Sequence, residues 1–186
     1  LIVGSALNSG VAVDGVTLTD IFNIGSVSLN SGGAVDFSGS DSTFKTLSVD
    51  QSSSINVNVA LSTSAGALDF TSAGDINVNV NTPSATTSSM TSGGIIQGAG
   101  AITATALTTS SASETNITTQ TASLNFANSG SGDVTVNNTG ALSLVGSNSA
   151  GNLSVTASGA LTQSAALTVS GTTNLDAAGN DITLTD

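Results

Sequence analysis

The chain has 186 residues, of which only 7% are charged, and twelve acidic residues against a single Lys give a net charge of −11 at pH 7. Because Lys45 is the only basic side chain, the chain cannot neutralise rows of phosphates, which excludes nucleic acid and anionic membrane surfaces as partners. The absence of cysteine excludes disulfides and thiolate chemistry.

The composition favours an ordered β protein. Val, Ile, Leu and Thr are plentiful and the mean hydropathy is +0.30, whereas disordered chains combine low hydrophobicity with high charge. No apolar run is long enough to span a bilayer, so we expect no membrane insertion. The start of the chain has neither an initiator Met nor a basic segment, so it does not resemble a signal peptide. We therefore expect residues 1–186 to be a single domain that is an excerpt or a processed piece of a longer repeat protein.

The first 50 residues contain short β runs separated by Gly and Ser. They recur every five or six residues or so, at residues 11–13, 16–18, 21–24 and 27–29. Such runs are shorter than sandwich strands and suit the short faces of a coil.

Two segments alternate strictly between aliphatic residues and Asn. The sequence Ile-Asn-Val-Asn-Val occupies residues 55–59 and recurs 21 positions later at residues 76–80. Alternation places Ile and Val on one face and Asn on the other. Stacked one above the next, these segments would form aliphatic columns inside and hydrogen-bonded Asn ladders outside.

The middle of the chain is less regular. Residues 81–92 contain the only proline, Pro83, and we interpret them as a loop that protrudes from one corner. Residues 102–126 are rich in Thr and alternate only weakly.

The clearest repeat runs from residue 132 to residue 169, as two copies with an offset of 19. Five residues of the first copy (Gly132, Val136, Gly140, Ala141 and Leu142) recur identically in the second (Gly151, Val155, Gly159, Ala160 and Leu161). A fixed period indicates a stacked architecture in which each repeat buries its apolar face against its neighbours. The sequence thus predicts an all-β fold, a parallel β-helix (β-solenoid) of roughly nine coils with a period of about 19–22 residues.

The last 55 or so residues also resemble a known family. The segment GNLSVTASGALTQSAALTVSGTTNLDAAGNDITLTD is similar to the repeats of filamentous-haemagglutinin-like exoproteins, which are bacterial adhesins exported by two-partner secretion. Residues 54–80 resemble these repeats less closely. The resemblance implies a right-handed helix and an extracellular or bacterial cell-surface location. The family's amino-terminal secretion domain, with its Asn-Pro-Asn-Gly type motif, does not occur here, so export by that route is implied only for a parent chain.

The chain contains few residue types that commonly serve in catalysis. His, Cys, Tyr, Trp and Arg are absent, so we predict that the chain is not an enzyme and assign no catalytic, cofactor-binding or metal residue. Two carboxylate pairs could in principle serve a glycoside hydrolase, Asp36 with Asp41 and Asp176 with Asp181. Lys45 alone is a poor lyase base. We interpret these acids as solvated turn residues.

The sequence also gives little indication of a specific ligand. Asn180 and Asp181, with Asp176 or Asp186, could contribute oxygens to calcium, but no calcium-loop motif occurs, so loose calcium binding is the most that we expect. Carbohydrate sites usually use aromatic platforms, and we expect the five Phe residues to fill the core instead: Phe22, Phe37, Phe44, Phe70 and Phe126. Glycan-acceptor sequons begin at Asn116, Asn137 and Asn152, and chance explains them in so Asn- and Thr-rich a chain.

These observations predict a secreted structural solenoid, the stalk or fibre of a bacterial surface adhesin or of an extracellular or biofilm-matrix filament. The strand-like segments at residues 1–3 and 182–184 are uncapped, so a subunit that stacks end to end is the alternative. A carbohydrate-active β-helix enzyme is a more distant alternative. The expected partners are further copies, end to end or laterally, and a receptor or glycan on a host or neighbouring cell.

Overall fold

A computed structural model describes residues 2–5, 10–13, 26–83, 86–146 and 148–185. All regular secondary structure in these ranges is β-strand. The described residues contain no helix that could cross a membrane. The strands are β1 (Ile2–Ser5), β2 (Gly10–Val13), β3 (Val27–Ser31), β4 (Ala34–Phe37), β5 (Ser42–Phe44), β6 (Leu47–Gln51), β7 (Ile55–Val57), β8 (Leu61–Thr63), β9 (Leu68–Ser72), β10 (Ile76–Val78), β11 (Thr82–Pro83), β12 (Thr87–Ser92), β13 (Ile96–Ser111), β14 (Thr115–Asn128), β15 (Val134–Asn138), β16 (Leu142–Leu144), β17 (Asn148–Ala150), β18 (Leu153–Ala157), β19 (Leu161–Gln163), β20 (Leu167–Val169), β21 (Thr173–Asp176) and β22 (Ile182–Thr183).

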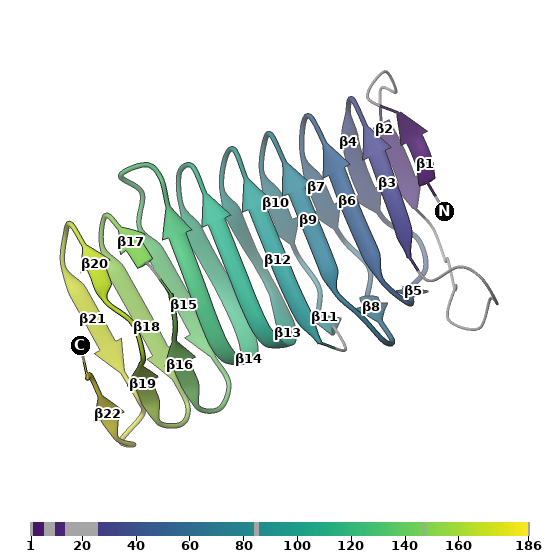
Figure 1. Cartoon of the computed structure of the whole chain (residues 1–186). Coiled ribbons are helices and arrows are strands. Elements are labelled where there is room, and N and C mark those ends of the chain that lie inside the picture. The colour runs from purple at the N-terminus through teal and green to yellow at the C-terminus, as the bar shows by residue number, and fades with distance from the viewer. Residues whose placement is uncertain (1, 6–9, 14–25, 84–85, 147, 186) are drawn as a thin grey trace.

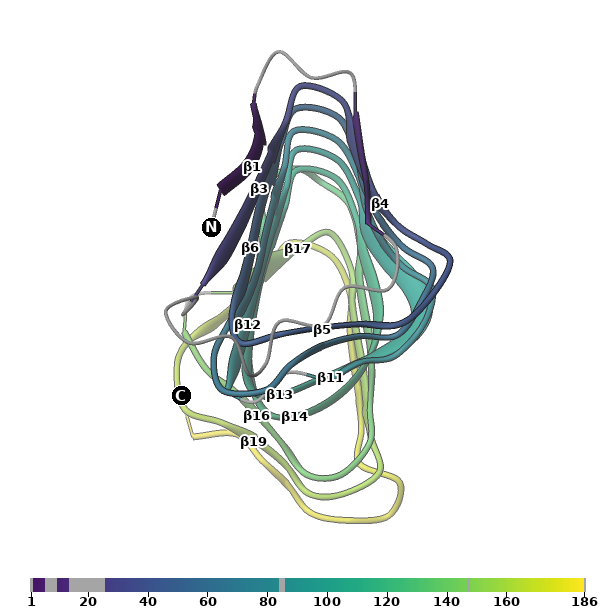
Figure 2. The same cartoon turned by 90° about the vertical axis from the view of Figure 1, so that its right-hand side faces the viewer.

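The strands wind into a parallel β-solenoid (Figure 1). Viewed from the N-terminal end in Figure 2, the chain rises along β3, descends along β4, crosses the base along β5 and rises again along β6 as it recedes. This clockwise, receding path is right-handed. The predicted fold class is therefore confirmed.

One ladder runs through almost the whole described chain. It joins β2, β4, β7, β10, β13, β14, β15, β18 and β21 by parallel pairings. Nine strands make eight steps, and the solenoid has about eight turns rather than the roughly nine expected. The difference arises partly near the N-terminus, where Gly10 pairs with Ala34, 24 residues on, so that this turn uses more chain than the period assumed.

The core is a set of aliphatic and aromatic columns. Inward positions alternate with outward ones along each strand. Ile55 pairs with Val35 of the preceding turn and with Ile76 of the following turn, and all three side chains are fully buried. The Phe residues at 37, 44, 70 and 126 are buried as predicted, and the rings of Phe37 and Phe70 stack with centroids 6.2 Å apart. The prediction for Phe22 lies outside the described residues.

The loop predicted over residues 81–92 is wrong where the structure describes it. Most of it belongs to strands β11 and β12, whose inward residues include Thr82, Ser88 and Met90. Small polar residues occupy inward positions here, so the contrast between apolar and polar positions is lost from the sequence. Pro83 is accommodated at the exposed end of a two-residue strand.

The weakly periodic segment 102–126 belongs to the two longest strands, β13 and β14, apart from residues 112–114 between them. Its Thr residues point inward as often as outward. Thr109, for example, is fully buried between Met90 and Phe126 in the stack.

A column of buried polar side chains closes one corner of the turns. Ser31, Gln51, Ser72, Ser92, Ser111 and Asn128 are partners in successive strands. Ser92 donates to the carbonyl of Gly74 at 2.7 Å, and Asn128 donates to the carbonyl of Gly132 at 2.7 Å. These side chains satisfy backbone groups that the corner would otherwise leave unpaired inside the protein.

Candidate functional site

Outward amides form a hydrogen-bonded ladder along one face. Asn56 donates to Asp36 at 2.5 Å, Asn77 donates to Asn56 at 2.8 Å, and Gln97 donates to Asn77 at 3.0 Å. The four residues are register partners on β4, β7, β10 and β13. The predicted external Asn ladders are thus confirmed, and Asp36 lies at the end of one of them.

A second ladder flanks a hollow in the surface. Asn79 donates to Asn58 at 2.8 Å, and both side chains are exposed where β10 and β7 end. Beside them lies a shallow, open hollow of about 570 Å³, which we name the corner hollow. Its lining residues are Asp41, Asn58, Val59, Ala60, Asn79, Val80, Asn81, Ala99 and Gly100.

Two lining side chains are anchored to the backbone of the following turn. The Oδ1 atom of Asp41 accepts a hydrogen bond from the Ala60 amide at 3.0 Å, and the Oδ1 atom of Asn81 accepts one from the Ala101 amide at 2.9 Å. The corner hollow therefore has a fixed polar rim, while the half-buried Val59 and Val80 supply its apolar surface.

A change in the strand register borders the corner hollow on its C-terminal side. Gln97 pairs with Asn116, but Ala101 pairs with Thr118, so three residues of β13 face one residue of β14. A Cβ atom on Gly100 would lie 2.1 Å from the carbonyl oxygen of Val80, so only glycine allows this close approach. Figure 2 shows that the earlier turns project farther at this corner than the turns after β14.

The proposed catalytic acids take part in structural hydrogen bonds. Asp36 accepts from Asn56 and Asp41 accepts from Ala60, as described above. In the last turn, Asp176 accepts from the amide of Ala178 at 2.8 Å, and the backbone carbonyl of Asp181 accepts from Leu161 at 2.9 Å.

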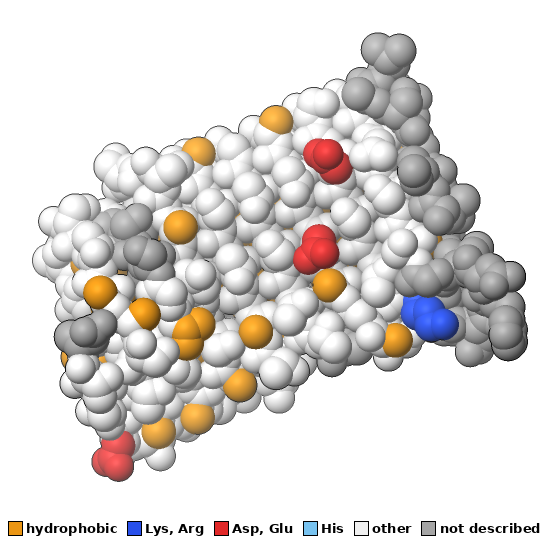
Figure 3. Space-filling view, viewed as in Figure 1, with side chains coloured by type: hydrophobic (Ala, Val, Ile, Leu, Met, Phe, Trp, Pro, Cys, Tyr) orange, Lys and Arg blue, Asp and Glu red, His pale blue; other side chains and the backbone are white. Residues whose placement is uncertain are grey.

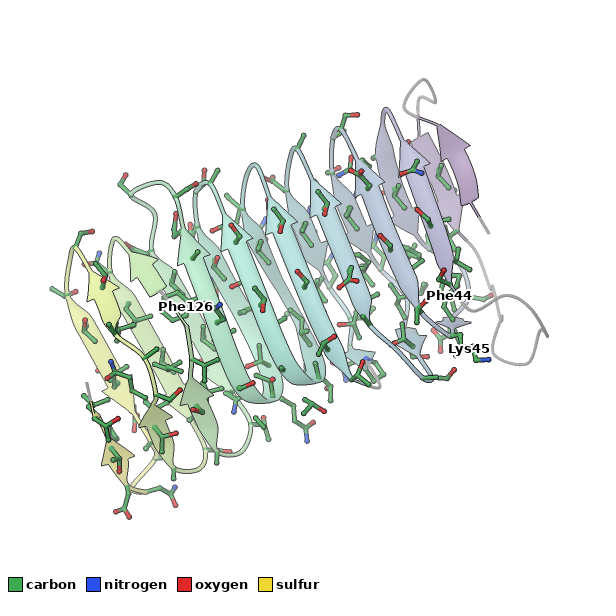
Figure 4. The ribbon with its side chains drawn as sticks, viewed as in Figure 1. Phe44, Lys45 and Phe126 are labelled. Atoms are coloured by element: carbon green, nitrogen blue, oxygen red, sulfur yellow. The ribbon has the colours of Figure 1, made fainter. Side chains whose placement is uncertain are left out.

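Lys45 lies at the edge of the base of the solenoid. Its side chain is exposed, whereas the neighbouring Phe44 points inward and is 1% exposed (Figure 4). Lys45 does not line the corner hollow.

Residues that could hold a metal ion do not gather in the described part of the chain. No group of three or more carboxylates is found there. Asn180, one of the proposed calcium ligands, donates to the carbonyl of Ala177 at 2.8 Å, and Asp186 lies outside the described residues.

The sequon residues lie on the surface. Asn116, Asn137 and Asn152 are all exposed. Asn152 belongs to a corner column in which its backbone and side-chain amides donate to Asp133 at 2.8 and 2.9 Å, and its Oδ1 accepts from the Thr172 amide at 2.9 Å. This Asn152 side chain therefore joins three successive turns.

The broad face formed by β6, β9 and their neighbours is mostly uncharged (Figure 3). Asp69 on β9 is one of the few acids on it, with Ser48 and Ser89 as its neighbours in the adjacent turns. Partial burial raises the pKa of the Asp69 carboxyl above its ordinary value, because desolvation disfavours the charged form.

Comparison with known families adds one finding. A family described as repeats of unknown function (DUF5649) matches residues 131–186, the segment that holds β15 to β22. The match covers the 19-residue repeats and supports a repeat protein with a solenoid fold. No curated protein and no solved structure matches the chain.

Sequence reasoning missed the corner hollow. A signal was present in the Asn residues after each Ile-Asn-Val run and in the glycines at positions 98 and 100, but their meeting at one corner depends on the exact register of four turns.

Proposed function

We propose that the chain is a rigid structural segment, the stalk or fibre of a bacterial surface adhesin or of an extracellular matrix filament. The observation that carries this proposal is the ladder of nine parallel strands that continues from turn to turn, with a register shift between β13 and β14. Each turn is hydrogen-bonded to both neighbours, so bending the rod requires many bonds and packed columns to deform together.

The surface suits a spacer. Outward side chains are largely Ser, Thr and Asn, and many are bonded to their counterparts in adjacent turns. A net charge of −11 keeps such a rod soluble and opposes unspecific association.

The location of the protein is part of the proposal. The resemblance of residues 132–186 to filamentous-haemagglutinin-like repeats supports an exported protein at the bacterial surface. An antibody against the purified chain tests this on intact cells of the source bacterium. We expect labelling without permeabilisation, and labelling that requires permeabilisation would contradict a surface location.

End-to-end stacking of copies is a second candidate. Its interface would include Ile182 and Leu184 in the last described turn, which are 42% and 53% exposed. Sedimentation at rising protein concentration should show growing assemblies for the unmodified chain and smaller ones for a double Ile182→Ser, Leu184→Ser variant. Monomers alone in electron micrographs at physiological ionic strength would count against stacking.

The proposal assigns no reaction and no cofactor to the chain. If a purified sample cleaved a glycan, replacing Asp36, Asp41, Asp176 and Asp181 by Asn in pairs should leave that activity unchanged at saturating glycan concentration. Loss of activity in either paired variant would instead favour the β-helix enzyme.

A further inference from the structure

We propose that the corner hollow binds a neutral oligosaccharide, through the side chains of Asp41, Asn58, Asn79 and Asn81. This site goes beyond the structural role proposed above and does not depend on it. The hollow, at about 570 Å³, lies within the size range of small-ligand sites.

The rim offers both donors and acceptors. Within the described residues, Asn58 and Asn81 use only their Oδ1 atoms in hydrogen bonds, which leaves both Nδ2 groups as donors. Asn79 uses only its Nδ2, and Asp41 uses only Oδ1, which leaves Oδ1 of Asn79 and Oδ2 of Asp41 as acceptors. A sugar hydroxyl donates one hydrogen bond and accepts others, so an alternation of donors and acceptors fits its chemistry.

The rim is held in place before any ligand arrives. Asp41 and Asn81 are fixed by backbone amides of the next turn, and Asn58 and Asn79 fix each other. Because these side chains are already ordered, binding loses little conformational entropy at the rim. The aliphatic groups of Val59 and Val80 provide a surface for the C–H face of a sugar ring.

Charge selects against other ligand classes. The only charged lining residue is Asp41, in a chain of net charge −11, so phosphates and acidic sugars would be repelled. A divalent cation would find one carboxylate, fewer than protein calcium sites commonly supply. The hollow crosses four turns, roughly 14 Å at the strand spacing, which favours a short chain of sugar units over a single ring.

The test is an NMR titration of the ¹⁵N-labelled chain with maltotriose, cellotriose and triacetylchitotriose, to millimolar concentration. At least one of these sugars should shift the side-chain amide signals of Asn58, Asn79 and Asn81, with other side-chain amides unmoved. Absence of saturable shifts with all three sugars would overturn the proposal. So would shifts of the same signals with calcium chloride but with none of the sugars.

Two variants preserve the fold-related bonds and exchange donor and acceptor at the ligand-facing atom, and each also changes the net charge by one unit. Asn81→Asp retains an oxygen for the Ala101 amide but replaces a donor by an acceptor, and Asp41→Asn retains an oxygen for the Ala60 amide but replaces an acceptor by a donor. Each should weaken binding of the responsive sugar roughly tenfold, the effect of one lost hydrogen bond, without altering the backbone spectrum. Asn174→Asp, exposed on β21 and outside the hollow, is the matched charge control and should bind as the unmodified chain does. Equal weakening in all three variants, or in none, would overturn the assignment of the site.

Discussion

Asn77 donates a hydrogen bond from Nδ2 to Oδ1 of Asn56, 2.8 Å away and 21 residues earlier in the chain. The same amide accepts from Gln97 in the following turn, so one side chain links three turns. Repetition of this relationship at successive turns accounts for the Asn-rich exterior: the amides extend the backbone ladder into the side chains.

Removing the central amide should therefore destabilise the solenoid. Asn77→Ala should lower the free energy of unfolding by about 1 kcal/mol, because two partners lose a bond in a partly exposed setting. Asn116→Ala, in the same outward column but exposed and outside the bonded series, is the control and should cost clearly less. Chemical denaturation measures both, and equal losses would show that the ladder contributes nothing specific.

Replacing either of two glycines by Ala should destabilise the fold, for a different reason at each position. A Cβ atom on Gly132 would lie 1.7 Å from the carbonyl oxygen of Ser113, so Gly132→Ala must push adjacent turns apart and should cost about 2 kcal/mol or more. Gly140 has open space around it but a φ of +95°, so Gly140→Ala should cost only about 1 kcal/mol of backbone strain. Thermal unfolding ranks the two variants, and the reverse order would contradict the close approach at Gly132.

Two buried hydroxyl groups are candidates for stabilising substitutions. The Oγ1 atoms of Thr82 and Thr109 are buried and find no hydrogen-bond partner among the described residues. Replacing either by Val keeps the shape and removes an unsatisfied polar group, which should raise stability by about 1 kcal/mol.

The control for these substitutions is Thr119→Val. The Thr119 hydroxyl is buried as well, but it donates to Asn138 at 2.9 Å, so its loss should destabilise the chain. If Val lowered stability at positions 82 and 109 as much as at position 119, the two hydroxyls would have partners after all.

The contribution of Asp69 to stability should depend on pH. Its pKa is raised in the folded state, so the folded chain binds the proton more readily than the unfolded chain, and the cost of burying the charge falls as the pH drops through the folded pKa. Asp69→Asn should therefore raise the melting temperature at pH 7, by roughly 1–2 °C for a partly exposed group, and the gain should vanish near pH 3. A gain that persists unchanged at pH 3 would point to a cause other than the carboxylate charge.

The sequence predicts the solenoid best where apolar and polar residues alternate cleanly. At residues 55–57 and 76–78 each inward Ile or Val is flanked by an outward Asn, and both the core column and the amide ladder follow directly, whereas Val59 and Val80 beyond the strand ends are only half-buried and line the corner hollow. Between residues 81 and 128, Ser and Thr occupy inward positions such as Ser88 and Thr109. Because inward and outward positions there both carry Ser or Thr, the sequence does not show which residues are buried. The loop prediction therefore failed, and the long strands β13 and β14 were not recognised.

The candidate site could not be predicted for a different reason. Its rim residues come from three turns, and their meeting depends on offsets of 19 to 21 residues and on the close packing of Gly100 against Val80. Alternation identifies Asn58 and Asn79 as outward, but only the register decides which Asn residues face a hollow.

The most direct test of the stacked architecture is disulfide formation between adjacent turns, since the chain has no cysteine of its own. Thr71 and Thr91 are exposed register partners on the parallel strands β9 and β12, whereas Ser89 is displaced by two residues. In-register neighbours about 4.8 Å apart lie within reach of a disulfide, and a two-residue shift places them at the edge of that reach or beyond it. We expect rapid oxidation of the Thr71→Cys, Thr91→Cys variant and little or none for Thr71→Cys, Ser89→Cys. Preferential cross-linking of the displaced pair, or no intramolecular cross-link in either, would contradict the stacked architecture.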